Sequence, residues 1–205
     1  MPTRRLSIFP LGGAILFPHM QLPLHIFEPR YCSLVSDAMA RNQRIGMIQP
    51  RSSDDPPALF DVGCIGRIGD IQALENGRYN IVLEGEMRFR VVRELDVTTV
   101  FRQVEAAPMT GEEDEPGILA SSERAALEAA SRVFADQLGY KVDWDGVGRL
   151  DDETLVNAIA QIGPFDIAGK QALLEADRLS DRSEMLIQLM QFQGRTDRPG
   201  SGTIQ

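Results

Sequence analysis

Three side chains that could form a nucleophilic site lie close together in the sequence: His25, Glu28 and Cys32. A cysteine nucleophile needs a histidine base within reach, and the base needs a third group that orients it. No nucleophile motif surrounds these residues, and a histidine in an apolar strand is usually structural. We therefore predict no catalytic residues here.

A second segment, residues 163–171, resembles a phosphate-binding loop. It reads Gly-Pro-Phe-Asp-Ile-Ala-Gly-Lys-Gln. The genuine loop has four residues between its glycines and a serine or threonine after its lysine. Here five residues intervene and glutamine replaces the hydroxyl residue. The segment also follows a helical pattern instead of a strand, so it predicts the end of one helix and the start of another. Gly63, Gly66 and Gly69 do not form a dinucleotide fingerprint and indicate a bent strand.

The remaining composition points to a non-catalytic protein without cofactor or metal. Two histidines and two cysteines, with no Cys-x-x-Cys or His-Glu-x-x-His, give no case for a metal site. We expect Cys32 and Cys64 to be small buried hydrophobic residues. The formal net charge of −9 argues against binding to a nucleic-acid backbone. No apolar run reaches the ~20 residues of a membrane helix, and we expect a cytoplasmic location.

The elements that position these residues begin with stretch 9–31, which contains four prolines. Because proline fixes φ and donates no backbone hydrogen bond, the stretch must wind through short strands and turns. A helix is expected over 29–41, with strands at 45–48 and 62–69. Asn76-Gly77 predicts a hairpin whose second strand breaks at Gly85-Glu86.

The charged residues that follow the hairpin alternate with apolar ones. Arg88, Arg90 and Arg93 should therefore point outward and form a solvated strand face with nearby glutamates.

After Pro108 the composition changes. The predicted organisation is a β-rich domain over 1–109, an acidic linker over 110–117, a helical bundle over 118–194 and a disordered tail over 195–205. The fold class is α+β. The expected helix ends are Gly139, Asp151 or Asp152, Asp166, Ser180 and Gly194.

Several motifs, taken in order, resemble one family. They are Phe9-Pro10-Leu11, Leu16-Phe17-Pro18, the segment 24–31 (Leu-His-Ile-Phe-Glu-Pro-Arg-Tyr), the segment 83–89 (Leu-Glu-Gly-Glu-Met-Arg-Phe) and the segment 170–175 (Lys-Gln-Ala-Leu-Leu-Glu). Together they resemble the substrate-binding N-terminal domain of the Lon ATP-dependent protease, and in particular the stand-alone bacterial proteins that carry this domain without the ATPase and peptidase modules. The resemblance implies a PUA-like pseudobarrel with one short helix, followed by a helical bundle. Val100-Phe101 departs from the Pro-Tyr that relatives often have there.

The resemblance implies a protein- or peptide-binding module, an adaptor or quality-control factor, without enzymatic activity. Its partners would be unfolded or partly folded polypeptides or a dedicated protein, and weak self-association stays open. A groove between barrel and bundle or an open strand edge would bind the peptide. Phe17, Ile26, Phe27 and Phe101 are candidate contacts, each of which could equally be core. RNA binding, frequent in PUA-like barrels, and a small hydrolase are the alternatives that charge and missing motifs disfavour.

Glu28 and Arg88 lie in the two sharpest of these motifs. We predict that they pair with each other and, with Arg30 and Tyr31, form a structural polar cluster that locks the first helix to the hairpin.

Overall fold

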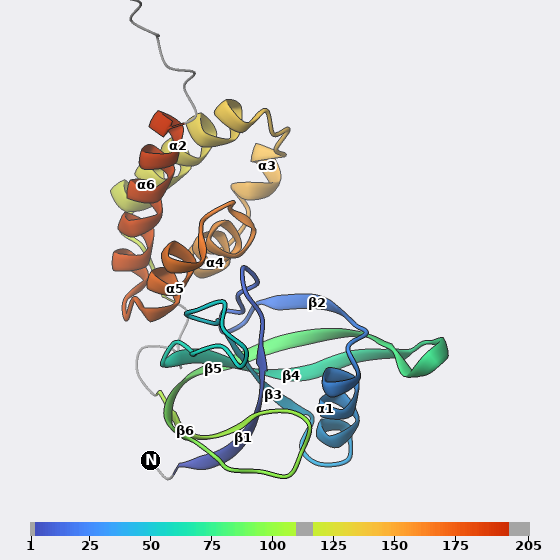
Figure 1. The fold of residues 1–205 in the computed structure, drawn as a ribbon. Helices are drawn as coiled ribbons and strands as arrows, with labels where there is room; N and C mark the ends of the chain where they lie inside the picture. Colours follow the sequence, from blue (N-terminus) through green and yellow to red (C-terminus); the bar gives the residue numbers. More distant parts are fainter. Residues whose placement is uncertain (1–2, 110–116, 197–205) are drawn as a thin grey trace, which may run out of the picture.

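The computed structural model describes residues 3–109 and 117–196, apart from the side chains of residues 195 and 196. Residues 110–116 of the expected linker and 197–205 of the expected tail lie outside the described residues. The fold is α+β, with strands in the first half and a helical bundle in the second (Figure 1). The strands are β1 (Arg4–Pro10), β2 (Gln21–Ile26), β3 (Arg44–Ile48), β4 (Val62–Ala73), β5 (Tyr79–Glu94) and β6 (Gln103–Pro108).

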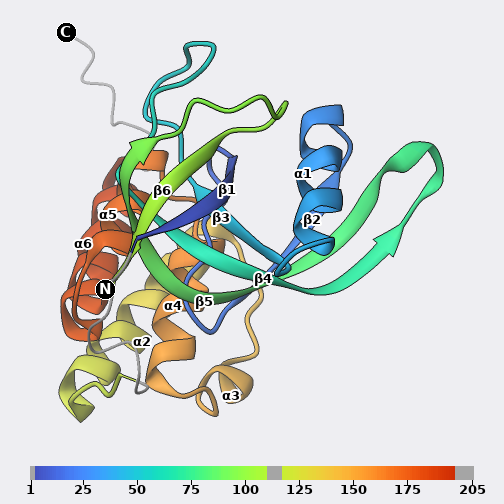
Figure 2. The ribbon, with the colours of Figure 1, turned by 90° about the horizontal axis from the view of Figure 1, so that it is seen from below.

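The strands form a barrel with one additional strand. Their order is β2-β5-β4-β3-β1-β6, and β5 also pairs with β6, which closes the last five strands on themselves. Among the strands that the structure describes, only β1 and β3 pair in parallel. Strand β2 stays outside the barrel, beside β5. Seen from below, the far end of the β4–β5 hairpin projects from the barrel (Figure 2). Helix α1 (Pro29–Met39) packs against β3 and β1.

The hairpin at Asn76-Gly77 is confirmed, but the expected break at Gly85 is wrong. Strand β5 continues through Gly85 for 16 residues, and its pairing with β4 shifts register nearby. A side chain at residue 85 would collide with the backbone oxygen of Phe17. The glycine therefore permits close approach of two chain segments inside a continuous strand.

The bundle consists of α2 (Ser121–Leu138), α3 (Trp144–Val147), α4 (Asp152–Ile162), α5 (Ile167–Glu175) and α6 (Leu179–Thr196). Three expected ends are confirmed: Gly139 ends α2 with φ 71°, and Asp151 and Asp166 cap α4 and α5 through their side chains. The last helix corrects two predictions. It starts before Ser180 and continues past Gly194, where a side chain would collide with Gln137 of α2.

The buried apolar residues form two clusters, and barrel and bundle share the larger one. A small cluster fills the barrel, with Phe89 at its centre. The larger cluster joins the outer surface of the barrel to α1 and to the bundle, and Phe17 is completely buried in it. No helix in the described part of the chain is long and apolar enough to span a membrane.

Candidate functional site

The junction between barrel and bundle is filled by side chains and hydrogen bonds. Lys170 is buried on α5, and its Nζ donates to the carbonyls of Gly13 (3.1 Å) and Gln161 (3.0 Å). Burial lowers the pKa of the Lys170 amine. Gln171, also buried, donates to the carbonyl of Val62 at 3.0 Å. These contacts occupy the region in which the sequence predicted a peptide-binding groove.

Arg88 belongs to this junction and does not pair with Glu28, which corrects the predicted cluster. Its guanidinium reaches the carbonyls of Leu174 (3.0 Å) and Ala176 (3.1 Å) at the end of α5. Arg88 is 4% exposed, so it points outward from the barrel as expected but its expected contact with solvent is wrong. The bundle covers the outer face of β5 here, and strand alternation no longer separates buried from solvated residues.

Glu28 forms a separate, local group with the other two predicted members. Its carboxylate contacts the guanidinium of Arg30 at 2.9 Å, and that guanidinium lies 4.6 Å from the centre of the Tyr31 ring. The Tyr31 hydroxyl donates to the carbonyl of Pro10 at 3.3 Å. Burial raises the pKa of this hydroxyl. The group fastens the start of α1 to the end of β1.

Three of the four predicted peptide contacts lie in the core. Phe17, Ile26 and Phe101 are at most 5% exposed and present no surface to a ligand. Phe27 is exposed and its ring stacks on His25 with 5.9 Å between ring centres. A peptide-binding role remains a prediction for Phe27 alone.

The residues that resembled a nucleophilic site or a phosphate-binding loop in the sequence have structural roles. His25 Nδ1 lies 2.8 Å from Asn80 Oδ1, and Cys32 Sγ donates to the carbonyl of Ile26 at 3.8 Å. The two cysteines are thiols, Cys64 buried and Cys32 partly buried. The segment 163–171 is a helix break and helix start, as predicted.

The open strand edge belongs to β2, which pairs only with β5. Pro23 lies in the middle of this strand and has no N–H to offer to an added strand. At the start of the strand, the carbonyl of Gln21 accepts a hydrogen bond from Gln161 of the bundle at 2.7 Å. The edge is a poor template for an extended peptide.

A strongly apolar hollow lies inside the bundle, between α2, α3 and α4. It has a volume of about 420 Å³, within the range of small-ligand pockets. We call it the bundle cavity. Its lining residues are Glu128, Ser131, Phe134, Ala135, Tyr140, Val142, Trp144, Val147, Leu150, Leu155, Ala158, Ile159, Ile162, Gly163, Pro164 and Met190.

The bundle cavity opens to solvent through an apolar rim. Ile162 on α4 is 79% exposed, and Tyr140, just after α2, is 57% exposed. Exposed large apolar side chains around a hollow are typical of surfaces that bind other molecules. A ligand can therefore contact the rim without removing water from many polar groups.

Residues 139–150 cross one side of the bundle cavity and carry α3. Gly139 turns the chain out of α2, and the side chain of Asp143 caps α3 by accepting from the N–H of Gly146 at 3.0 Å. Trp144, the only tryptophan of the chain, lines the cavity and is stacked by the guanidinium of Arg132 at 4.4 Å. A ligand in the cavity would change the surroundings of this indole ring.

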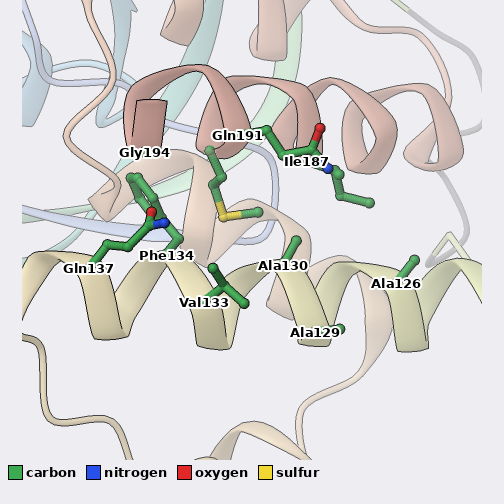
Figure 3. Close-up of a pocket in the computed structure, with 10 residues that line it drawn as sticks. Ala126, Ala129, Ala130, Val133, Phe134, Gln137, Ile187, Gln191 and Gly194 are labelled. Atoms are coloured by element: carbon green, nitrogen blue, oxygen red, sulfur yellow. The ribbon is translucent and has the colours of Figure 1, made fainter. Parts of the chain in front are cut away.

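A second hollow lies between α2 and α6, with a volume of about 510 Å³ (Figure 3). Alanines 126, 129 and 130, with Val133, line the α2 side, and Ile187 and Gln191 come from α6. Small side chains make this a broad groove in which Phe134 is the only aromatic lining residue, whereas Phe134, Tyr140 and Trp144 line the bundle cavity. We therefore choose the bundle cavity as the candidate site.

The sequence did not identify this site, and none of its candidate residues lines the bundle cavity. A signal was present: Tyr140, Val142, Trp144 and Val147 are large apolar residues in a stretch that also holds charged residues and glycines. The large apolar side chains of such a segment either pack on an apolar surface elsewhere in the protein or remain exposed to solvent.

Comparison with known proteins gives the family. The sequence model of the ATP-dependent protease La (LON) substrate-binding domain matches residues 5–191. Lon protease of Haemophilus influenzae is 27% identical over 92% of the chain, and Lon protease of Azorhizobium caulinodans is 28% identical over 90%. The chain spans about a quarter of the length of these relatives, 24% and 22%.

Two solved structures share the fold. The Lon N-terminal domain protein from Xanthomonas campestris has a TM-score of 0.66 at 23% identity, and the alignment covers 90% of this chain and 98% of that one. The N-terminal domain of Mycobacterium avium complex Lon protease has a TM-score of 0.68 at 17% identity, with 92% and 98% covered. The chain belongs to the family of the substrate-binding domain of the ATP-dependent protease La (Lon).

Proposed function

We propose that this chain is a non-catalytic polypeptide-binding module that takes apolar segments of unfolded or partly folded chains into the bundle cavity. The observation that carries the proposal is the cavity itself, with Trp144 in its wall and Ile162 exposed on its rim. Its volume of about 420 Å³ accommodates one or two large side chains. The matching family model, which describes a substrate-binding domain and not a catalytic one, supports the same role.

The wider role that we propose is that of an adaptor or quality-control factor, which holds a chain for another protein to process. A cytoplasmic location, expected from the sequence, belongs to the same proposal. Binding without turnover is a testable part of it: neither ATP nor chromogenic ester and peptide substrates should be hydrolysed.

Trp144 supplies a direct test, because the chain has no other tryptophan. A tryptophan-free polypeptide, kept unfolded by reduction and alkylation of its cysteines, is titrated into the protein while indole emission is followed. We expect a saturable shift that persists at high salt, since the contacts are apolar. RNA binding, the alternative, would weaken steeply with salt.

A matched pair of variants locates the binding. Ile162→Ser removes an exposed rim residue at little risk to folding and should weaken binding about threefold to tenfold, as loss of one apolar contact of this size implies. Val100→Ser removes a similarly exposed side chain, 69% against 79%, from the barrel half and should not change the affinity. Equal affinities for both variants, or no emission change at high micromolar polypeptide, would refute the proposal.

A further inference from the structure

The segment 139–150, which we call the strap, is held mainly at its two ends. It begins at Gly139, where α2 ends, and Asp151, the cap of α4, follows it directly. Within the described part of the chain, every hydrogen bond of residues 141–150 has its partner inside the strap. None of the described strap residues is buried. Because so few contacts hold it, the strap should open locally far more often than the protein unfolds.

The middle of the strap is tied to α2 by one ring contact. The guanidinium of Arg132 lies 4.4 Å from the centre of the Trp144 ring. Val147 and Leu150 also pack against the larger apolar cluster, but both remain partly exposed. A cation that stacks on a ring at an exposed site gives only weak stabilisation. The stack therefore positions the strap without locking it.

The apolar side chains of the strap face a cavity that is open to solvent. Tyr140, Val142, Trp144, Val147 and Leu150 all line the bundle cavity. Tyr140 and Val142 are exposed, and the other three are partly exposed. An apolar side chain that enters the cavity would bury part of this surface, and would bury more of it if the strap moved inward. Ligand binding and inward movement of the strap should therefore favour each other.

We propose that the strap closes over an apolar side chain bound in the bundle cavity, and that the stack of Arg132 on Trp144 keeps the empty strap near its closed position. The inference rests on the proposed function and adds a closing step at the same site. The strap joins two helix ends, and such positions are common hinges in loops that close over ligands.

Trypsin can measure the opening of the strap, because Lys141 and Arg149 are exposed within it. Cleavage after these two residues is followed by mass spectrometry at low trypsin concentration, where the rate reports the population of the open form. Arg88 is buried and reports global unfolding, whereas Arg51 is exposed in the barrel half and reports the activity of trypsin itself. Without ligand, the two strap sites should be cleaved faster than the site after Arg88.

The ligand is the peptide Ser-Ser-Phe-Leu-Phe-Ser-Ser, which contains no tryptophan and no trypsin site. Its Kd is first measured from the emission of Trp144. At about ten times this Kd, cleavage after Lys141 and Arg149 should fall about fivefold to tenfold, because binding to the closed form depletes the open form in proportion to 1 + [L]/Kd. Cleavage after Arg51 should not change.

A variant of the stack tests the role of Arg132. Arg132→Met should speed cleavage after Lys141 and Arg149 about twofold to fivefold in the absence of peptide, as loss of one exposed stack implies. Arg30→Met is the matched control, because the guanidinium of Arg30 lies 4.6 Å from the centre of the Tyr31 ring in the barrel half. It should leave the strap cleavage unchanged.

The outcomes separate this inference from the proposed function. If the peptide shifts the emission of Trp144 but leaves cleavage of the strap unchanged, the closing step is wrong and the binding function stands. The closing step is also wrong if the free protein is cleaved no faster in the strap than after Arg88. Equal effects of Arg132→Met and Arg30→Met would overturn the role of the stack. If the peptide does not change the emission of Trp144, the proposed function itself fails.

Discussion

Replacing Arg88 by methionine should destabilise the whole protein. The guanidinium of Arg88 donates to the carbonyls of Leu174 and Ala176, where α5 ends and its last carbonyls lack helical partners. These carbonyls also form the negative end of the helix dipole, which a cation stabilises. Methionine fills the space of the arginine stem but donates no hydrogen bond, so both carbonyls lose a donor.

The expected magnitude follows from these two hydrogen bonds. A hydrogen bond to a charged group contributes roughly 1.5–3 kcal/mol. Part of this is offset in the variant, because a guanidinium no longer has to be buried. We expect the free energy of unfolding to fall by about 2–4 kcal/mol. For a chain of this size, that lowers the melting temperature by about 5–15 °C.

Thermal and urea unfolding followed by circular dichroism measure this change. Arg90→Met is the matched control, because Arg90 lies two residues further along β5 and is exposed; it should cost less than about 0.5 kcal/mol. Glu28→Ala should cost less than about 1 kcal/mol, since its partner is the exposed Arg30. An Arg88→Met change no larger than that of Arg90→Met, or a Glu28→Ala change as large as that of Arg88→Met, would refute the assignment.

Three further predictions concern the junction, a helix cap and a strand glycine. Because burial lowers the pKa of Lys170 below the 10.5 of a free lysine, the unfolded chain binds more protons than the folded one between the lowered pKa and 10.5. The free energy of unfolding of the wild type, relative to Lys170→Met, should therefore rise as the pH rises through this window; urea midpoints at several pH values measure it, and a fall would contradict the reasoning. Asp151→Ala removes the cap of α4 and should cost about 1 kcal/mol in urea unfolding, whereas Asp151→Asn should retain most of the stability. Gly63→Ala would push a methyl group into the backbone oxygen of Met47 and should cost about 1–3 kcal/mol, whereas Gly148→Ala meets only ordinary contacts and should be close to neutral.

Features fixed by neighbouring residues could be predicted from the sequence. Asp151 and Asp166 cap helices through N–H groups three residues away, and Asn76-Gly77 makes its turn from its own dihedral angles. Gly194 shows the limit of this logic. A glycine near the end of a helical pattern indicates a cap, but here α6 continues past it and the amide end of the Gln137 side chain of α2 lies beside it.

Features that depend on distant segments could not be predicted. Arg88 follows the alternation of a solvated strand, and only the position of α5 makes it buried. Phe17 and Phe27 are the same residue type in the same proline-rich stretch, yet one is fully buried and the other 61% exposed. The candidate site was missed for a related reason, because Trp144 becomes part of a wall only when α2 and α4 are placed around it.

The arrangement of the two halves makes stability and binding separable. The junction holds the bundle on the barrel through Arg88 and Lys170. Helix α3, which carries Trp144 of the bundle cavity, lies on the side of the bundle away from the barrel (Figure 1). Arg88→Met should therefore lower the melting temperature but leave the affinity of the folded protein, measured by Trp144 emission well below that temperature, within about twofold of wild type. Ile162→Ser should do the reverse, because it removes an exposed contact and no buried one. If Arg88→Met weakens binding as much as Ile162→Ser does, the cavity depends on the junction for its shape, and the two halves act as one binding unit.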